Sequence, residues 1–436
     1  MREALAALAL LAAAPALAQA APPPATAVPA SMLKTRLDQL VALLNGKAGY
    51  DTLFSPSFRH AVPRAQLQSF VAGLKAQGGL ATGVASIDAV TPWQATVKIA
   101  YQRVVATFQI AIDPAAPHLI TGLRSTGTAP QGDSLAKLDA DFRKLPGASG
   151  FGIYALSDQG VTPVAQLNGE TAAPLASGFK LWVLAEAVRQ INAGERHWDD
   201  VVRVGRHSLP SGILQTWPGG APVTLQTLAT LMISISDNTA ADTLLTTLGR
   251  DNVDKVVKTL GVADPARTLP VLTTGEAFAL KTTANAALAG RWATATPEAR
   301  LALLKDNTDK LTSQPLDPAM FGAKPLAIDS VEWFASPADM ARTLNWLRQH
   351  GDATMRDILS VTPKTDPANA RQFGYIGFKG GSEPGVITMS FLIETKTGAW
   401  FAVTGNWHNA AAAVGEAAFG ALMNRALALA TRENRE

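Results

Sequence analysis

The sequence contains no cysteine, which excludes disulfide bonds, thiol nucleophiles, cysteine-ligated zinc and a lipid-bearing cysteine. Charged residues make up only 17% of the 436 residues, and 38 basic residues nearly balance 35 acidic ones. No run of like charges forms a basic face, so the sequence does not indicate nucleic-acid binding. The six histidines are scattered and form no metal-binding pattern. We therefore expect neither a metal nor a cofactor.

Two further motifs are missing, Gly-x-Ser-x-Gly and Gly-x-Gly-x-x-Gly, and their absence argues against an α/β-hydrolase and a dinucleotide enzyme. What is present is a hydrophobic content of 47%, which is enough to bury a substantial core. A length of 436 residues predicts two or three domains, because a typical domain has about 150 residues.

The first thirty residues are typical of an export signal followed by a linker. Arg2 precedes an Ala/Leu run at 4–17 that is too short to span a bilayer, and small residues near its end offer two A-x-A cleavage sites. Three prolines at 22–24 then make a stiff, non-helical exit. We predict a signal peptide at 1–20, a Pro/Ala-rich linker at 21–31 and a secreted, periplasmic protein. No later segment has 18 uninterrupted apolar residues, so we expect no integral membrane segment after signal removal.

Residues 32–128 are predicted to form a small α+β domain. Apolar residues first recur at helical spacing, and the pattern then changes to strand-like alternation, as at 95–101 and 104–110. Helices followed by an antiparallel meander are similar to the cystatin-like or steroid-isomerase-like folds. No acid–base pair stands out in this segment, so we interpret it as an accessory or substrate-shaping module.

Residues 129–436 are predicted to form a second domain, in which strands enclose a long helical stretch. The pattern indicates a helix, two strands, a run of helices, three strands and a final helix. The predicted strands lie at 151–156, 161–166, 374–378, 386–394 and 399–407. Strands from both ends of the domain can join in one sheet. We therefore predict an α/β (α+β) fold, with a five-stranded antiparallel sheet and an all-helical subdomain.

A Ser-x-x-Lys pattern occurs at 31–34, 134–137 and 177–180, and only the third copy opens a long apolar-faced helix directly after a predicted hairpin. Serine and lysine at this spacing share one face of a helix. A desolvated lysine, or one crowded by another cation, has a lowered pKa and can take the proton of the serine. We predict Ser177 as the nucleophile and Lys180 as its base.

A second motif, Ser-Asp-Asn, occupies 236–238 and follows Ser177 by 59 residues. The hydroxyl of Ser236 can relay a proton to a leaving nitrogen, and the amide of Asn238 can hold a substrate carbonyl and the lysine. An alternative reading is a helix cap, because serine, aspartate and asparagine are all good caps. The presence of Ser177 upstream favours the catalytic reading.

These two motifs, with their spacing and their surrounding residues, resemble those of class A β-lactamases and penicillin-binding proteins over about residues 132–436. The resemblance implies a third motif of the Lys-Thr-Gly type on a strand. A literal copy at 396–398 lies in a predicted hairpin turn, whereas Lys-Gly-Gly-Ser at 379–382 ends a predicted strand. We assign the role to the second segment, in which Gly380 departs from the hydroxyl residue of the family.

The resemblance also implies roles for the residues of this third motif. Lys379 would attract a substrate carboxylate and add positive field beside Lys180. The backbone N–H groups of Ser177 and Ser382 would form the oxyanion hole, and Gly381 belongs to the same substrate-binding segment.

Class A enzymes carry a deacylating glutamate in a Glu-x-x-Leu-Asn setting, and this string is missing here. The nearest candidate is Glu276, with Leu280 at the expected asparagine position, inside a segment at 263–329 that is longer than the loop of the family. Without a positioned base the acyl-enzyme could be long-lived, which separates a penicillin-binding protein from a β-lactamase.

The sequence thus predicts a serine β-lactamase-like hydrolase that acts through a Ser177 acyl-enzyme on a small β-lactam or related acyl or peptide substrate. One alternative is a D-alanyl-D-alanine peptidase or penicillin-binding protein. Another is a non-hydrolytic module that binds β-lactams or the cell wall. Some proteins of this superfamily carry a steroid-isomerase-like domain before such a body, and their substrates can drift to esters, so antibiotic resistance does not follow from the resemblance. The oligomeric state is not predicted.

Overall fold

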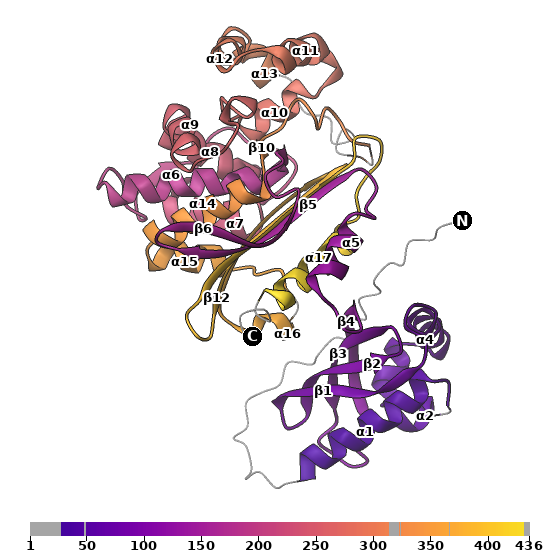
Figure 1. Ribbon diagram of the computed structural model, residues 1–436. Coiled ribbons are helices and arrows are strands. Elements are labelled where there is room, and N and C mark those ends of the chain that lie inside the picture. The colour runs from indigo at the N-terminus through magenta and orange to yellow at the C-terminus, as the bar shows by residue number, and fades with distance from the viewer. Residues whose placement is uncertain (1–27, 48, 314–321, 323, 366, 431–436) are drawn as a thin grey trace. The chain divides into compact units, whose positions relative to one another are not determined.

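A computed structural model of the protein describes residues 28–47, 49–313, 322, 324–365 and 367–430 (Figure 1). The predicted signal peptide, and most of the predicted linker, lie outside these residues. The chain divides into two compact units: Met1–Lys137 with Asp366–Ala368, and Leu138–Thr365 with Asn369–Glu436. Within the described part of the chain, no helix has both the length and the apolar character needed to cross a membrane.

The residues described in the first unit form four helices and a four-stranded antiparallel meander. The helices are α1 (Val28–Leu44), α2 (Tyr50–Leu53), α3 (Pro56–Ala61) and α4 (Arg64–Gly78), and the strands are β1 (Ala81–Thr91), β2 (Gln94–Tyr101), β3 (Val104–Ile112) and β4 (Ile120–Pro130). Every second residue of β3 is buried, because one face of the sheet packs on the core and the other does not. The core contains Leu37, Leu40, Phe54, Val97 and Phe108. Helices followed by a meander agree with the predicted α+β organisation.

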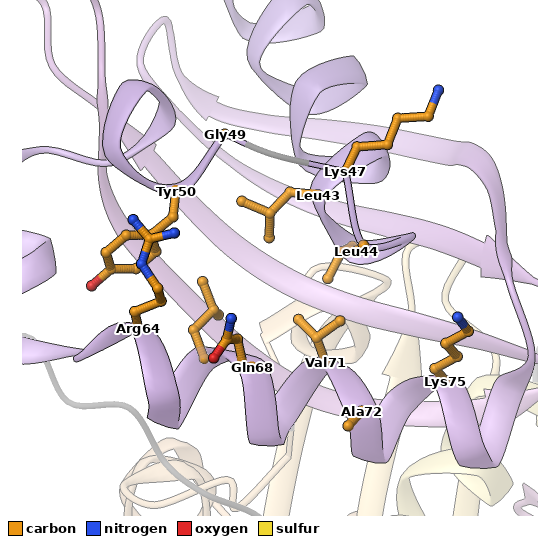
Figure 2. Close-up of a pocket in the computed structure, with 12 residues that line it drawn as sticks. Leu43, Leu44, Lys47, Gly49, Tyr50, Arg64, Gln68, Val71, Ala72 and Lys75 are labelled. Atoms are coloured by element: carbon orange, nitrogen blue, oxygen red, sulfur yellow. The ribbon is translucent and has the colours of Figure 1, made fainter.

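A hollow of about 340 Å³ opens on this unit between the end of α1 and helix α4 (Figure 2). Its lining combines apolar side chains, among them Leu43, Leu67 and Val71, with the three basic residues Lys47, Arg64 and Lys75. The residues that line it include no carboxylate. This hollow therefore has no acid–base pair, and the interpretation of the unit as an accessory module stays a prediction.

The second unit is built on one five-stranded antiparallel sheet in the order β11-β12-β13-β5-β6. Its strands are β5 (Ala148–Ser157), β6 (Gly160–Leu167), β11 (Phe373–Glu383), β12 (Val386–Thr395) and β13 (Trp400–His408). The first eight residues of β12 are all buried, which explains their nearly continuous apolar sequence. Strand β13 pairs with β5, so the two ends of the domain meet in the sheet as predicted.

Helices cover both faces of this sheet (Figure 1). Helices α5 (Leu135–Phe142) and α17 (Glu416–Leu429) lie on one face, and α14 (Pro337–His350) packs on the other. Helix α6 (Lys180–Asn192) packs against α14 and α8. The remaining helices are α7 (Leu225–Ser234), α8 (Asn238–Leu248), α9 (Arg250–Thr259), α10 (Thr274–Leu280), α11 (Ala286–Thr294), α12 (Pro297–Asp306), α13 (Thr308–Ser313), α15 (Ala353–Ser360) and α16 (Pro367–Ala370). The predicted helical subdomain is therefore present.

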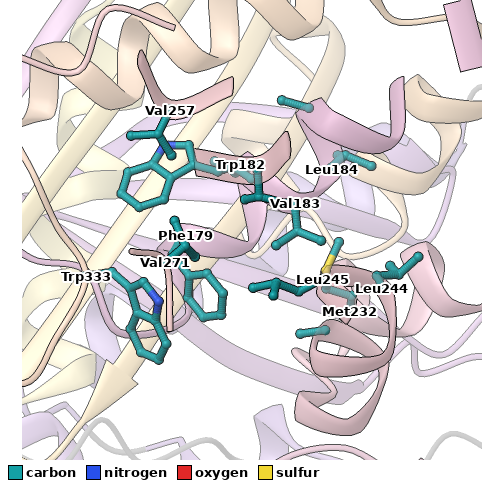
Figure 3. Packing of buried hydrophobic residues seen from close by; sticks show 14 of the residues in the cluster. Phe179, Trp182, Val183, Leu184, Met232, Leu244, Leu245, Val257, Val271 and Trp333 are labelled. Carbon is teal, nitrogen blue, oxygen red and sulfur yellow. The ribbon is translucent and has the colours of Figure 1, made fainter. Parts of the chain in front are cut away.

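The buried side chains of α6 belong to a large hydrophobic core in the second unit (Figure 3). The ring of Phe179 stacks on Trp333 at a centroid distance of 3.9 Å, and Trp182 is completely buried. Met232 and Leu244 pack into the same cluster from α7 and α8. Dense packing of this kind resists displacement, so the start of α6 is held rigidly.

Candidate active site

Ser177 and Lys180 lie at the start of α6, one turn apart. Ser177 belongs to a 3-10 helix, η1 (Ala176–Phe179), that runs directly into α6, and the backbone N–H of Lys180 donates to the carbonyl of Ser177. Ser177 is half-buried, whereas Lys180 is completely buried. The serine is thus partly accessible and the lysine is desolvated, and the roles of the two as nucleophile and base stay a prediction.

The ammonium group of Lys180 contacts both ends of the Ser-Asp-Asn segment. Its Nζ donates to Oδ1 of Asn238 at 2.6 Å, to the carbonyl of Ser236 at 2.6 Å and to Oγ of Ser236 at 3.1 Å. Burial lowers the pKa of Lys180 to about 7, although the charges of Asp242 and Asp237 oppose this shift. A sizeable fraction of neutral amine is therefore available near neutral pH to accept a proton.

Lys379 approaches the same hydroxyl from β11. Its Nζ donates to Oγ of Ser236 at 3.0 Å and to the carbonyl of Gly380 at 2.6 Å. Burial, and then the positive charge of Lys180, hold the pKa of Lys379 well below its usual value. The hydroxyl of Ser236 therefore lies between two amines, an arrangement through which a proton can pass.

The Ser-Asp-Asn segment serves as a helix cap and as part of the site at the same time. The carboxylate of Asp237 caps α8 by accepting from Ala240, and it also accepts from the N–H groups of Ile213 and Leu214. Ser236 has a left-handed φ of 58°, which is uncommon for a residue other than glycine. The two readings of the sequence are thus compatible, because Asp237 holds the turn while its neighbours contact Lys180.

Strand β11 passes very close to Ser177, the candidate nucleophile, at Gly381. A Cβ atom at this position would lie 2.5 Å from the backbone nitrogen of Ser177 and 2.7 Å from that of Gly178. The next residue, Ser382, is exposed at the same end of β11. Glycine therefore permits the approach that an oxyanion hole between Ser177 and Ser382 requires, and the role of these two N–H groups stays a prediction.

Among the described residues, Glu276 has no contact with Ser177, Lys180 or Ser236. It is the third residue of α10, and its carboxylate closes a capping box with Thr273. Both of its oxygens lie 2.7 Å from the guanidinium of Arg250, and one also accepts from the N–H of Thr273 at 2.8 Å. The structure thus gives Glu276 a helix-capping and ion-pairing role, and its part in deacylation stays a prediction.

The literal Lys-Thr-Gly copy at 396–398 lies in the exposed turn between β12 and β13. The copy of Ser-x-x-Lys at 134–137 is also at the surface, where Lys137 donates to the carbonyls of Gln131 and Gly132. Over the described residues, no three histidine or acidic side chains are grouped so that they could hold a metal ion.

Two buried acidic residues beside the candidate site were not predicted from the sequence. The first is Asp242, which is buried on α8 and accepts from the backbone of Thr274 and Gly275, so it ties α10 to the site. The second is Glu332, which accepts from the N–H of Ala176 next to the nucleophile and pairs with Lys281. The one available signal for Glu332 was a charged residue between strongly apolar neighbours.

The sequence matches the model of a protein family described as "Beta-lactamase enzyme family" over residues 134–414. A search of curated proteins finds no match. Among solved structures, a beta-lactamase from Sphaerobacter thermophilus DSM 20745 is similar, with 22% identity and a TM-score of 0.46 over 68% of this chain and 96% of that chain. The structure of PBP-A has 15% identity and a TM-score of 0.46 over 69% and 95% of the two chains. A beta lactamase from Xanthomonas campestris pv. campestris str. ATCC 33913 has 18% identity and a TM-score of 0.46 over 69% and 97%.

Proposed function

Because this chain belongs to the beta-lactamase enzyme family, we propose that it is a serine hydrolase of class A type that forms an acyl-enzyme at Ser177 with β-lactams or related acyl compounds. The observation that carries this proposal is the environment of Lys180. This amine is fully buried, has a pKa lowered to about 7 and stands one helical turn from a half-buried serine hydroxyl. Such a group is suited to act as a general base near neutral pH.

Acylation would begin with attack of the Ser177 hydroxyl oxygen on the substrate carbonyl carbon. Neutral Lys180 takes the hydroxyl proton, and the N–H groups of Ser177 and Ser382 bind the developing oxyanion. The bond from carbon to the leaving nitrogen then breaks, and Ser236 gives its hydroxyl proton to that nitrogen while it takes from Lys180 the proton that came from Ser177. Support for this relay is the position of the Ser236 hydroxyl, which is within 3.1 Å of Lys180 and 3.0 Å of Lys379.

Substrate recognition would depend on Lys379 and Asn238. The amine of Lys379 would donate to the carboxylate that β-lactams and peptide ends share, and the negative charge of that carboxylate would favour the protonated amine. The Nδ2 group of Asn238 donates to the carbonyl of Leu209 at 3.2 Å, so its amide is held in a fixed orientation beside Lys180. Gly380 offers no side-chain hydrogen bond to this carboxylate, and we therefore expect weak ground-state binding.

A penicillin-binding protein or D-alanyl-D-alanine peptidase is the second candidate, and the contacts of Glu276 favour it. Both oxygens of this carboxylate are held by Arg250, and one also binds Thr273. A carboxylate fixed in this way is poorly placed to activate a water molecule at Ser177. We therefore expect deacylation to be slow compared with acylation.

Intact mass spectrometry of the protein mixed with a penicillin, sampled from seconds to hours, tests both candidates. An adduct that forms and decays while the drug is consumed indicates a β-lactamase, and an adduct that persists indicates a penicillin-binding role. Ser177→Ala should form no adduct. Ser134→Ala, which removes the serine of another Ser-x-x-Lys copy, should react like the unchanged protein. A Ser177→Ala variant that is still acylated would overturn the proposal.

We also propose that the protein is exported to the periplasm, on the basis of the signal-like pattern in its first twenty residues. Expression of the full chain in a Gram-negative host should yield a periplasmic form that has lost about twenty residues. An uncleaved chain confined to the cytoplasm would contradict this proposal, and the mass of the purified protein distinguishes the two results.

A further inference from the structure

The turn before the nucleophile is held in an unfavourable conformation. Ala176 has a φ of 44°, in the left-handed region that favours glycine. Such a conformation persists only where neighbouring groups hold it. Here the backbone N–H of Ala176 donates to Oε2 of Glu332 at 3.0 Å, from a residue 156 positions away in the sequence.

Glu332 is part of a buried charge cluster that reaches β11. Its other oxygen, Oε1, accepts from Nζ of Lys281 at 2.7 Å. The same Nζ donates to both oxygens of Glu383, at 2.7 and 2.8 Å. The side chains of Lys281 and Glu332 are almost completely buried, and that of Glu383 is 14% exposed. Lys281 therefore connects the turn at Ala176 to the end of the strand that carries Ser382.

The charges of this cluster do not balance if all three groups are ionised. Burial, and then the negative charge of Glu332, raise the pKa of Glu383 to about 8, although Lys281 partly opposes both effects. The two carboxylates outweigh the effect of burial on Lys281 and raise its pKa. Near neutral pH, Glu383 is therefore mostly protonated and Lys281 keeps its ammonium charge.

We propose that Lys281, Glu332 and Glu383 form a positioning network that sets the distance between the two N–H groups of the oxyanion hole. This inference rests on the acyl-enzyme function proposed above. Glu332 fixes the residue before Ser177, and Glu383 is the residue after Ser382. The single ammonium of Lys281 holds both carboxylates, so a change on either side is transmitted to the other.

The network also makes the oxyanion hole sensitive to alkaline pH. Glu383 faces Lys281 at the end of α10 and Glu332 before β10 (Phe334–Ala335), while its partner in the β12 ladder is the apolar Val386. Loss of the last proton places two carboxylates around one ammonium in a buried site, and their repulsion loosens the turn at Ala176. Acylation should therefore decline as Glu383 ionises.

The pH profile of the acylation rate constant, measured with a chromogenic cephalosporin, tests this network. The unchanged protein should lose rate about tenfold per pH unit above roughly pH 8, because one proton is lost. Glu383→Gln should remove this alkaline limb and leave the acidic limb unchanged. Glu394→Gln, on the adjacent strand β12, is the matched control and should keep the full profile. A Glu383→Gln profile with the alkaline limb intact would overturn the inference.

A second kinetic readout separates positioning from binding. Glu332→Gln keeps an acceptor for Ala176 but removes the charge that holds Lys281. Its acylation rate constant should fall at least tenfold, while the dissociation constant of the noncovalent complex stays unchanged. Equal changes in both constants, or no change in either, would contradict a positioning role.

Thermal unfolding tests the network without any acyl transfer. The pKa of Glu383 is raised in the folded protein, so its contribution to stability is complete below the unfolded value of 4.5 and is lost as the pH rises through about 8. The Tm of Glu383→Gln should therefore increase relative to the unchanged protein between pH 5 and 8. If the Tm difference between Glu383→Gln and the unchanged protein does not depend on pH, the network is refuted, whether or not Ser177 is acylated. If this difference rises with pH, the network is supported even when no β-lactam reacts.

Discussion

At the scale of single residues, the site is a hydroxyl held between two buried amines. Lys180 and Lys379 both donate to Oγ of Ser236, and burial lowers the pKa of each. Buried amines are costly for the fold, because each loses its hydration. Such shifted groups cluster at functional sites, which agrees with the role of proton acceptor that we propose for Lys180.

The pH dependence of acylation follows from Lys180. Because only the neutral amine can accept the proton of Ser177, the acylation rate should rise with pH through about 7 and fall about tenfold per unit below it. Lys180→Ala should lose about 10²–10⁴-fold in rate and this acidic limb together. Stopped-flow measurements between pH 5 and 8 check this, and an acidic limb that survives in Lys180→Ala would assign it to another group.

The close approach at Gly381 gives a second test at this scale. Gly381→Ala would push a methyl group against the backbone nitrogens of Ser177 and Gly178, and overpacking of this kind costs about 1–3 kcal/mol. Acylation should fall by roughly 10²-fold or more, the usual effect of a lost oxyanion-hole donor. Gly374→Ala on the same strand is the control, since its nearest neighbour would be 3.5 Å away. Similar kinetics for the two variants would argue against a tight site.

At the scale of elements, the sequence predicted the strands and the motif residues of the candidate site, but it did not predict the long-range contacts that hold them in place. The strands of the sheet were recognisable because they are apolar and bounded by turns, and Ser177, Lys180, Ser236, Asn238 and Lys379 lie in or beside regular elements. The bond from Ala176 to Glu332 spans 156 residues and exists only after the chain has folded. No local pattern indicates such a contact.

Helix α10 shows the same limit. Thr273 and Glu276 have the Thr-x-x-Glu spacing of a capping box, but this spacing does not exclude a catalytic base, and the ion pair of Glu276 with Arg250, 26 residues away, exists only in the folded chain. Local sequence could not decide between these roles, because both require a glutamate near a helix start.

The geometry of α10 predicts a stability effect rather than a kinetic one. Glu276→Ala should lower the free energy of unfolding by about 1 kcal/mol, through loss of a cap and a partly buried ion pair. The lifetime of the acyl-enzyme should stay within about twofold of the original value. Glu298→Ala, in the exposed first turn of α12, is the control for a lost helix-start carboxylate. A much longer-lived adduct in Glu276→Ala would instead identify this residue as the deacylating base.

At the scale of the whole molecule, the two units have separate hydrophobic cores. The first unit buries Leu37, Phe54 and Phe108, and the second buries Leu184, Leu244 and Leu344. Separate cores allow the units to unfold independently, which a single two-state transition would not describe.

Differential scanning calorimetry should therefore resolve two transitions. Leu37→Ala should lower only one of them, by the equivalent of about 2–5 kcal/mol, and leave acylation of Ser177 unchanged. Leu184→Ala is the matched substitution behind α6, and it should lower the other transition. One transition that shifts equally in both variants would mean that the units unfold as one body.

The pairing of β5 with β13 has a consequence for synthesis on the ribosome. Trp400 pairs with Leu156, and His408 pairs with Ala148, so the sheet is completed only after synthesis has passed residue 408, about 250 residues after β5. Long-range pairing of this kind is slow to form and leaves sheet edges open meanwhile. A nascent chain that already contains Ser177 and Lys180 still lacks the strand that carries Lys379. Reactivity toward acyl compounds should thus arise abruptly once β11, β12 and β13 have been made and have joined β5, not gradually as the chain grows.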